Sequence, residues 1–199
     1  MKPRTYAMNP NGPVLPPGSA PGAVRMLTLG KRDWELVVPG GDWGGEWTWK
    51  RTGLLERTWS LASERGTYLV LCEPNVFERR RRAEAASAGW TLTRSWVCRT
   101  IVSDDDGTEL LRYEPGAWGR GPIVPASGPD LKFRWQWIGG FSLETRDGHE
   151  LLLLKRAPGF LSRDHQLTLS DAVRVREDLL PLLALTWLLA LSAGHSYAH

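Results

Sequence analysis

The most concentrated chemistry in this sequence is a run of four arginines. Consecutive guanidinium groups repel one another, so they remain in water or bind phosphate groups. Anionic lipid headgroups and a nucleic-acid backbone both carry such phosphates. The alternative is a solvated helix surface, because Glu78 and Glu84 flank the run. The candidate ligand-binding residues of this run are Arg79, Arg80, Arg81 and Arg82.

Two of the 11 tryptophans lie in segments too rich in glycine and proline to form a regular core. Trp43 is bracketed by Gly40-Gly41 and Gly44-Gly45, and Trp118 lies in the segment 115–130. An exposed tryptophan beside arginine suits a membrane interface or stacking on a nucleic-acid base. Alternatively, both rings fold back onto the body of the protein. We treat Trp43 and Trp118 as further candidate ligand-binding residues.

No residue pattern predicts a metal site. The acidic cluster Asp104–Asp106 precedes Gly107, and the twelfth position of a Ca²⁺ loop counted from Asp104 is Pro115, which has no carboxylate. The cluster therefore predicts a hairpin turn. His195 and His199 have i,i+4 spacing, but they follow Gly194 at the very end of the sequence, where helices fray.

Catalytic signatures are also missing from the sequence. It contains no nucleophile elbow, P-loop or dinucleotide fingerprint, so we expect no catalytic residue and no cofactor. The two cysteines, Cys72 and Cys98, fall within predicted strands and cannot form a disulfide scaffold. We expect both to be reduced core thiols of a cytoplasmic protein.

The elements that position these residues are mainly strands. Between Val24 and about Arg156, large apolar side chains alternate with polar ones, which is typical of strands with one buried face. In one such predicted strand, Trp90, Leu92 and Trp96 alternate with Thr91, Thr93 and Ser95. Asp147-Gly148 predicts a tight turn, so 141–146 should pair antiparallel with 149–155. Three further segments are predicted differently: 77–88 as a short helix or long loop, 115–130 as an irregular excursion, and 172–177 as one more strand.

The two ends of the chain differ from this pattern. Residues 1–23 contain six prolines and predict an extended or disordered arm, unless they dock along the surface. Residues 24–199 then form a single domain. Leu179–Gly194 is apolar on all sides and carries no charge over 16 residues, whereas a bilayer span needs about 20. We expect no transmembrane span and a helix over about 179–193 buried inside a curled sheet.

The order of these parts resembles the tubby-like superfamily, which includes the tubby C-terminal domain, the LURP-one-related proteins and the phospholipid scramblases. The resemblance covers about residues 24–194 and rests on the strand meander, the Trp-x-Trp strands at 47–49 and 135–137, and the helix that opens with 178–185. It implies a fold that is all-β with one C-terminal helix: a closed antiparallel barrel of about twelve strands around a central hydrophobic helix. It also implies a scaffold that contacts phospholipids or membranes. The sequence lacks the cysteine-rich palmitoylation stretch and Ca²⁺ loop of scramblases, so the resemblance does not extend to lipid scrambling.

The resulting functional hypothesis is a non-catalytic binding module that associates with anionic phospholipid at a membrane surface. Two alternatives belong to other classes: a nucleic-acid or protein interaction scaffold that uses Arg79–Arg82, and an enzyme with an unrecognised site. The formal net charge of +3 permits an anionic partner but does not select one.

Overall fold

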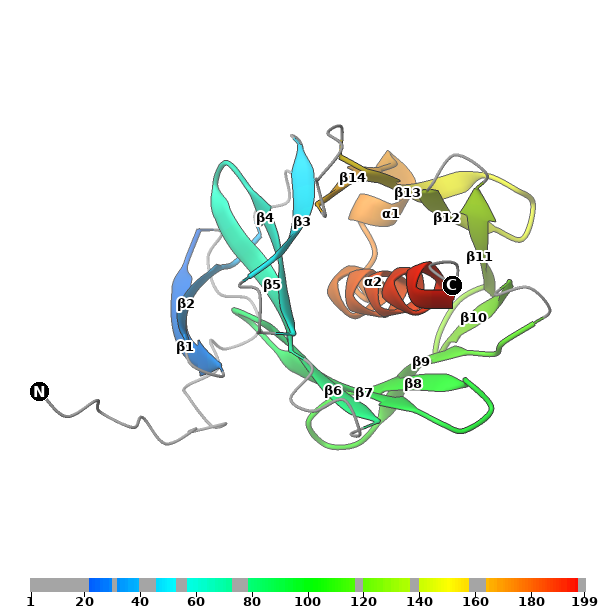
Figure 1. Ribbon diagram of the computed structural model, residues 1–199, viewed down its shortest axis with the longest axis horizontal. Helices are drawn as coiled ribbons and strands as arrows, with labels where there is room; N and C mark the ends of the chain where they lie inside the picture. The colour runs from blue at the N-terminus through cyan, green and yellow to red at the C-terminus, as the bar shows by residue number, and fades with distance from the viewer. Residues whose placement is uncertain are drawn as a thin grey trace, which may run out of the picture.

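The computed structural model describes residues 22–29, 32–39, 46–52, 57–72, 79–116, 120–136, 140–157 and 164–196. Within these ranges the chain forms fourteen strands and two helices, and twelve of the strands close into a barrel (Figure 1). The barrel strands are β3 (Trp47–Arg51), β4 (Thr58–Ser63), β5 (Gly66–Cys72), β6 (Arg80–Ala85), β7 (Gly89–Arg94), β8 (Thr100–Ser103), β9 (Glu109–Tyr113), β10 (Gly121–Pro125), β11 (Leu131–Gln136), β12 (Gly140–Thr145), β13 (Glu150–Arg156) and β14 (His165–Leu169).

The barrel is an antiparallel meander that closes on itself. Each strand from β6 to β14 pairs with its neighbours in sequence, β14 pairs with β3, and β5 closes the ring against β6. β12 pairs with β13 around the Asp147-Gly148 turn, as the sequence predicted. Closure leaves no free edge among the twelve strands, which removes the usual site of strand-to-strand aggregation.

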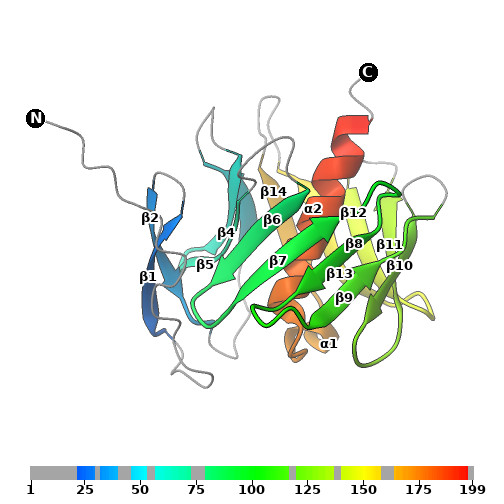
Figure 2. The same ribbon diagram turned by 90° about the horizontal axis from the view of Figure 1, so that it is seen from below.

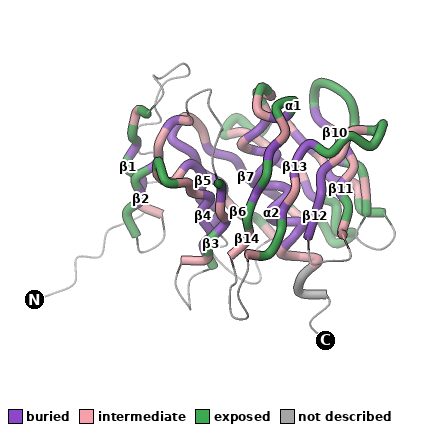
Figure 3. Tube along the Cα trace, turned by 90° about the horizontal axis from the view of Figure 1, so that it is seen from above, coloured by how far each residue is buried: buried purple, intermediate pink, exposed green. Residues whose placement is uncertain are grey.

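The C-terminal helix α2 (Leu179–Ser196) runs through the middle of this barrel (Figures 1 and 2). Its side chains are buried from Leu182 to Ala190, on every face of the helix (Figure 3). Trp187 stacks on Trp49 of β3, with the ring centroids 5.0 Å apart and the planes 3° from parallel. The predicted core helix is therefore confirmed, and the apolar inner faces of the strands replace the lipid that such a helix would otherwise need.

A separate hairpin lies outside the barrel. It consists of β1 (Val24–Leu29) and β2 (Arg32–Val37), and it joins the sheet through a parallel pairing of Leu36 with Thr67 of β5. The hairpin builds a second, smaller hydrophobic cluster on the outer face of β5 and the end of β6. This cluster contains Leu27, Trp34, Leu36, Val38, Val70 and Ala86.

The sequence predictions for three segments were wrong, and strand pairing or local contacts explain the differences. Segment 77–88 contains strand β6 rather than a helix or loop: Ala83 and Ala85 face the core, and β6 pairs on both sides to close the ring. Segment 115–130 contains strand β10, which tolerates Pro122 and Pro125 at positions near its ends.

The third error concerns segment 172–177, which contains part of the short helix α1 (Asp171–Arg174) rather than a strand. Arg174 pairs with Asp171 at 3.1 Å, one helical turn earlier, and donates a hydrogen bond to the Leu169 carbonyl at 3.1 Å. These local contacts turn the chain from β14 into α2, so the alternation of Val173 and Val175 does not form a strand.

Candidate functional site

The four arginines of the run, Arg79–Arg82, lie at the start of β6 and have different surroundings. Arg82 lies inside the strand opposite Thr91, and its side chain is 30% exposed. Arg81 is half-buried. Arg79 and Arg80 lie at the start of the strand, where Arg80 is exposed and the Arg79 carbonyl accepts a hydrogen bond from the Arg94 amide at 2.9 Å.

Arg82 belongs to an internal ion-pair network. Its Nε donates to Glu84 Oε1 at 2.6 Å, and its Nη2 lies 2.5 Å from Asp105 Oδ1. Glu84 is almost completely buried and also receives Arg25 from β1, at 3.4 Å. Burial lowers the pKa of Arg82, but the hydrogen bond and charge of Glu84, followed by those of Asp105, outweigh it and leave this pKa raised. Arg82 therefore serves the structure, tying the hairpin and the β8–β9 turn to β6.

Arg79 has a different partner. Its guanidinium lies over the indole ring of Trp96, a residue that the sequence assigned to a strand with a buried face. That assignment was wrong, because β7 ends at Arg94 and Trp96 is 88% exposed. Its neighbour Val97 is 69% exposed. Two large apolar side chains thus project into solvent beside a stacked cation.

Trp96 and Val97 occupy the tip of the β7–β8 hairpin. Ser95 N–H donates to the Arg99 carbonyl at 2.8 Å, and Cys98 N–H donates to the Ser95 carbonyl at 3.1 Å. Cys98 has a φ of 61°, in the left-handed region. The sequence placed Cys98 in a buried strand, and this prediction was wrong, whereas Cys72 in β5 is buried as expected.

Two other hairpins repeat this hydrogen-bond pattern with different residues. The β8–β9 turn closes through Asp104 and Thr108, and the β12–β13 turn through Thr145 and His149. Both place glycine at the left-handed position, with φ of 84° at Gly107 and 89° at Gly148. Asp104 Oδ1 accepts the amides of Asp106 and Thr108 at 3.0 and 2.8 Å, which confirms the predicted acidic turn. Of these three turns, only the β7–β8 turn carries Trp, Val and Cys between its closing residues, where the other two carry Asp-Asp-Gly and Arg-Asp-Gly.

The apolar turn and the acidic turns lie at opposite ends of the barrel. Arg94, the last residue of β7, donates to Ser192 Oγ near the end of α2 at 2.8 Å, so the Trp96 tip lies at the end where the C-terminus emerges. We call this the arginine end. Its described connections and the strand residues next to them contain Arg51, Arg57, Arg79, Arg80, Arg94, Arg99, Arg120 and Arg156, with Glu114 and Asp164 as the acidic members.

The other end, where α1 leads into α2, has the reverse charge balance, and we call it the acidic end. Its described connections and the strand residues next to them contain the acidic residues Glu46, Glu64, Asp104, Asp105, Asp106, Glu109, Asp130, Asp147, Glu150, Asp171, Glu177 and Asp178, and the basic residues Arg65, Arg146, Arg174 and Arg176. Among the described residues the two ends of the barrel therefore differ in charge, and a charge difference of this kind orients a protein in the field of a charged partner.

The candidate tryptophans Trp43 and Trp118 lie outside the described residues, as do the side chains of His195 and His199. Of the four candidate arginines, Arg79 stacks on Trp96 and Arg80 lies at the same end of the barrel. Arg81 lies opposite Leu92 within the sheet, and Arg82 belongs to the internal network. Trp96 was not among the candidate residues predicted from the sequence. A signal was present, because Arg94 interrupts the apolar series of Trp90, Leu92 and Trp96, and Val97 breaks the alternation directly after it.

The described residues contain no cluster of three histidine, cysteine or acidic side chains able to hold a metal ion. Within that same part of the chain, no helix has the length and hydropathy needed to cross a membrane. The protein matches no protein-family model, no curated protein and no solved structure.

Proposed function

We propose that this protein is a non-catalytic binding module that docks on anionic membrane surfaces through its arginine end. The observation that carries the proposal is the exposed Trp96–Val97 tip flanked by Arg79 and Arg80, with Arg99 beside it paired to Glu114 at 2.9 Å. Tryptophan is enriched where an apolar interior meets headgroups, and arginine binds the phosphates at that same depth.

The arrangement of the barrel supports a surface mode of binding. α2 occupies the barrel interior, with Leu182, Leu185 and Trp187 no more than 1% exposed, so a lipid is recognised from outside. The acidic end is repelled by an anionic surface while the arginine end is attracted, which selects one orientation. The resemblance to the tubby-like superfamily adds the expectation that the barrel contacts phospholipid.

The contribution of the Trp96–Val97 tip to the free energy of membrane binding follows from its exposed area. A tryptophan side chain buries roughly 150–250 Å² when it leaves water, and at about 25 cal/mol/Å² full transfer of Trp96 yields about 4 kcal/mol. Insertion to headgroup depth recovers about half of this, or roughly 30-fold in affinity. Each arginine close to an anionic surface adds about 1 kcal/mol.

The test is co-sedimentation with vesicles of phosphatidylcholine alone and of phosphatidylcholine mixed with phosphatidylserine. The unmodified protein should sediment with the mixed vesicles only, and Trp96→Ala should weaken this binding by about 30-fold. Val175→Ala provides the matched control, because Val175 is 83% exposed at the acidic end and should bind as the unmodified protein does.

A second arm separates lipid from nucleic acid. Single-stranded and duplex DNA are titrated with the same variants in a mobility-shift assay over a range of salt concentrations. Tight, salt-sensitive DNA binding that depends on Trp96, together with no vesicle binding, would replace the membrane proposal with the nucleic-acid alternative.

A further inference from the structure

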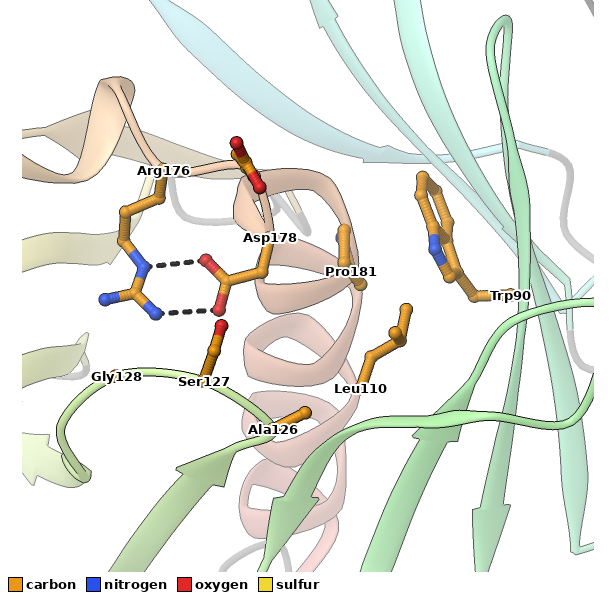
Figure 4. Close-up of a pocket in the computed structure, with 9 residues that line it drawn as sticks. Trp90, Leu110, Ala126, Ser127, Gly128, Arg176, Asp178 and Pro181 are labelled. Atoms are coloured by element: carbon orange, nitrogen blue, oxygen red, sulfur yellow. Dashed lines mark hydrogen bonds and ion pairs between the residues drawn. The ribbon is translucent and has the colours of Figure 1, made fainter. Parts of the chain in front are cut away.

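A cavity of about 420 Å³ opens at the acidic end, far from the arginine end (Figure 4). Trp90 of β7, Leu110 of β9 and Pro181 in the first turn of α2 form its apolar wall. The lining also includes Ala126 and Ser127 in the β10–β11 turn and Glu177, which precedes α2. Cavities of this size that combine an apolar wall with a few polar groups hold small organic ligands.

The charges around the cavity favour a cation. Arg176 also lines it, but its guanidinium is held by Asp178 through two hydrogen bonds, each 2.7 Å long. The charges of Arg176 and Asp178 therefore cancel each other. Among the described residues, the exposed Glu177 carboxylate makes no ion pair or hydrogen bond, so the cavity retains a negative charge within an end of the barrel that is already acidic.

The aromatic wall of the cavity favours a ligand with an apolar body. In Figure 4 the indole of Trp90 stands opposite Pro181, with Leu110 beside them. Trp90 is held in this position because it is 6% exposed and belongs to the main core. Because so little of this indole is exposed, it serves as a fixed apolar wall against which an aromatic or aliphatic body packs.

From the cavity, its unpaired carboxylate and its indole, we infer that the acidic end binds a small organic ammonium compound with an apolar body. The ammonium group pairs with Glu177, and the apolar body lies against Trp90, Leu110 and Pro181. This site is independent of the membrane proposal, because it shares no residue with the arginine end.

The experiment compares three probes of similar shape on the full chain by isothermal titration calorimetry and by NMR of the tryptophan indole protons. The probes are 2-phenylethylammonium, neutral 2-phenylethanol and anionic 3-phenylpropionate. We expect the ammonium compound to bind best. Glu177→Gln should weaken its binding about fivefold, as loss of one solvent-exposed ion pair predicts, and leave the alcohol unchanged.

Two variants test the location of the site. Ala126→Phe and Ser127→Phe each place a ring at an exposed turn position in the mouth of the cavity, and either one should abolish binding while the melting temperature stays the same. Lys132→Gln, on the neighbouring strand, is the control for a general change of charge. Equal binding of all three probes, binding that survives both blocking variants, or no binding of any probe would each overturn the inference.

Discussion

Arg80 and Arg82 lie in the same strand, β6, but have different surroundings, so we expect their substitution to affect stability and membrane binding differently. Arg82→Gln removes the 2.6 Å hydrogen bond to Glu84 and the pairing with Asp105. Glu84 keeps one cationic neighbour, Arg25 at 3.4 Å, and its side chain is only 5% exposed. Arg80→Gln changes an exposed side chain that is in none of these contacts.

The size of the effect follows from burial. Breaking a fully buried ion pair costs about 3–5 kcal/mol because a charge is left without compensation. Arg82 is 30% exposed and Glu84 retains Arg25, so we expect about 2 kcal/mol for Arg82→Gln. In a chain of this length that corresponds to a melting temperature lower by roughly 4–8 °C. Arg80→Gln should change stability by less than about 0.5 kcal/mol.

Thermal melts and vesicle co-sedimentation of both variants test whether Arg82 stabilises the fold while Arg80 binds the membrane. Arg82→Gln should lose stability and retain vesicle binding when measured well below its melting temperature. Arg80→Gln should melt with the unmodified protein and bind vesicles about fivefold more weakly. Equal stability of the two variants would refute the assignment of Arg82 to a structural network.

Two further predictions concern the fold itself. Leu185 is completely buried inside the barrel, so Leu185→Asp places an unpaired charge in the core and should leave the protein insoluble or unfolded, whereas a soluble variant with a cooperative melt would show that α2 is not the core. Gly148 has a φ of 89°, and a Cβ at this position would meet no atom within 4 Å, so Gly148→Ala introduces backbone strain without a steric clash. Denaturant unfolding should show a free energy of unfolding lower by about 1 kcal/mol, with a smaller decrease for Gly148→Asn. An unchanged free energy of unfolding would mean that the turn relaxes.

The barrel and its core helix could be predicted because their signals are local and redundant. Period-two alternation identifies strands individually, Asp-Gly turns connect them, and an uncharged helix that is apolar on all sides must be enclosed. β6 was not predicted as a strand because Arg, Ala and Glu are good helix formers. The segment forms a strand because it pairs with β5 and β7 at the same time. The small Ala83 and Ala85 side chains then fit between the barrel wall and the rest of the core.

The functional residues were predicted less completely, for reasons that are also physical. The arginine run was visible in the sequence, but its division into exposed and network members depends on Glu84 and Asp105, which approach only in the folded barrel. Trp96 looked like one more strand residue, because its exposure depends on β7 ending two residues earlier. A hairpin tip that uses Trp and Val in place of Asp and Gly breaks the local turn preference, and such departures concentrate at functional surfaces.

Cys98 offers the most direct test of the membrane proposal, because it is an exposed thiol next to the Trp96–Val97 tip while Cys72 is buried. A nitroxide attached to Cys98 reports its depth through collisions with oxygen, which concentrates in lipid, and with a water-soluble nickel chelate. On vesicles containing phosphatidylserine, the label should gain oxygen contact and lose nickel contact. The same label at Val175→Cys, in a Cys98→Ser background, should stay in water. A Cys98 label that remains in water on vesicles that bind the protein, or a label at position 175 that enters the lipid, would contradict docking through the arginine end.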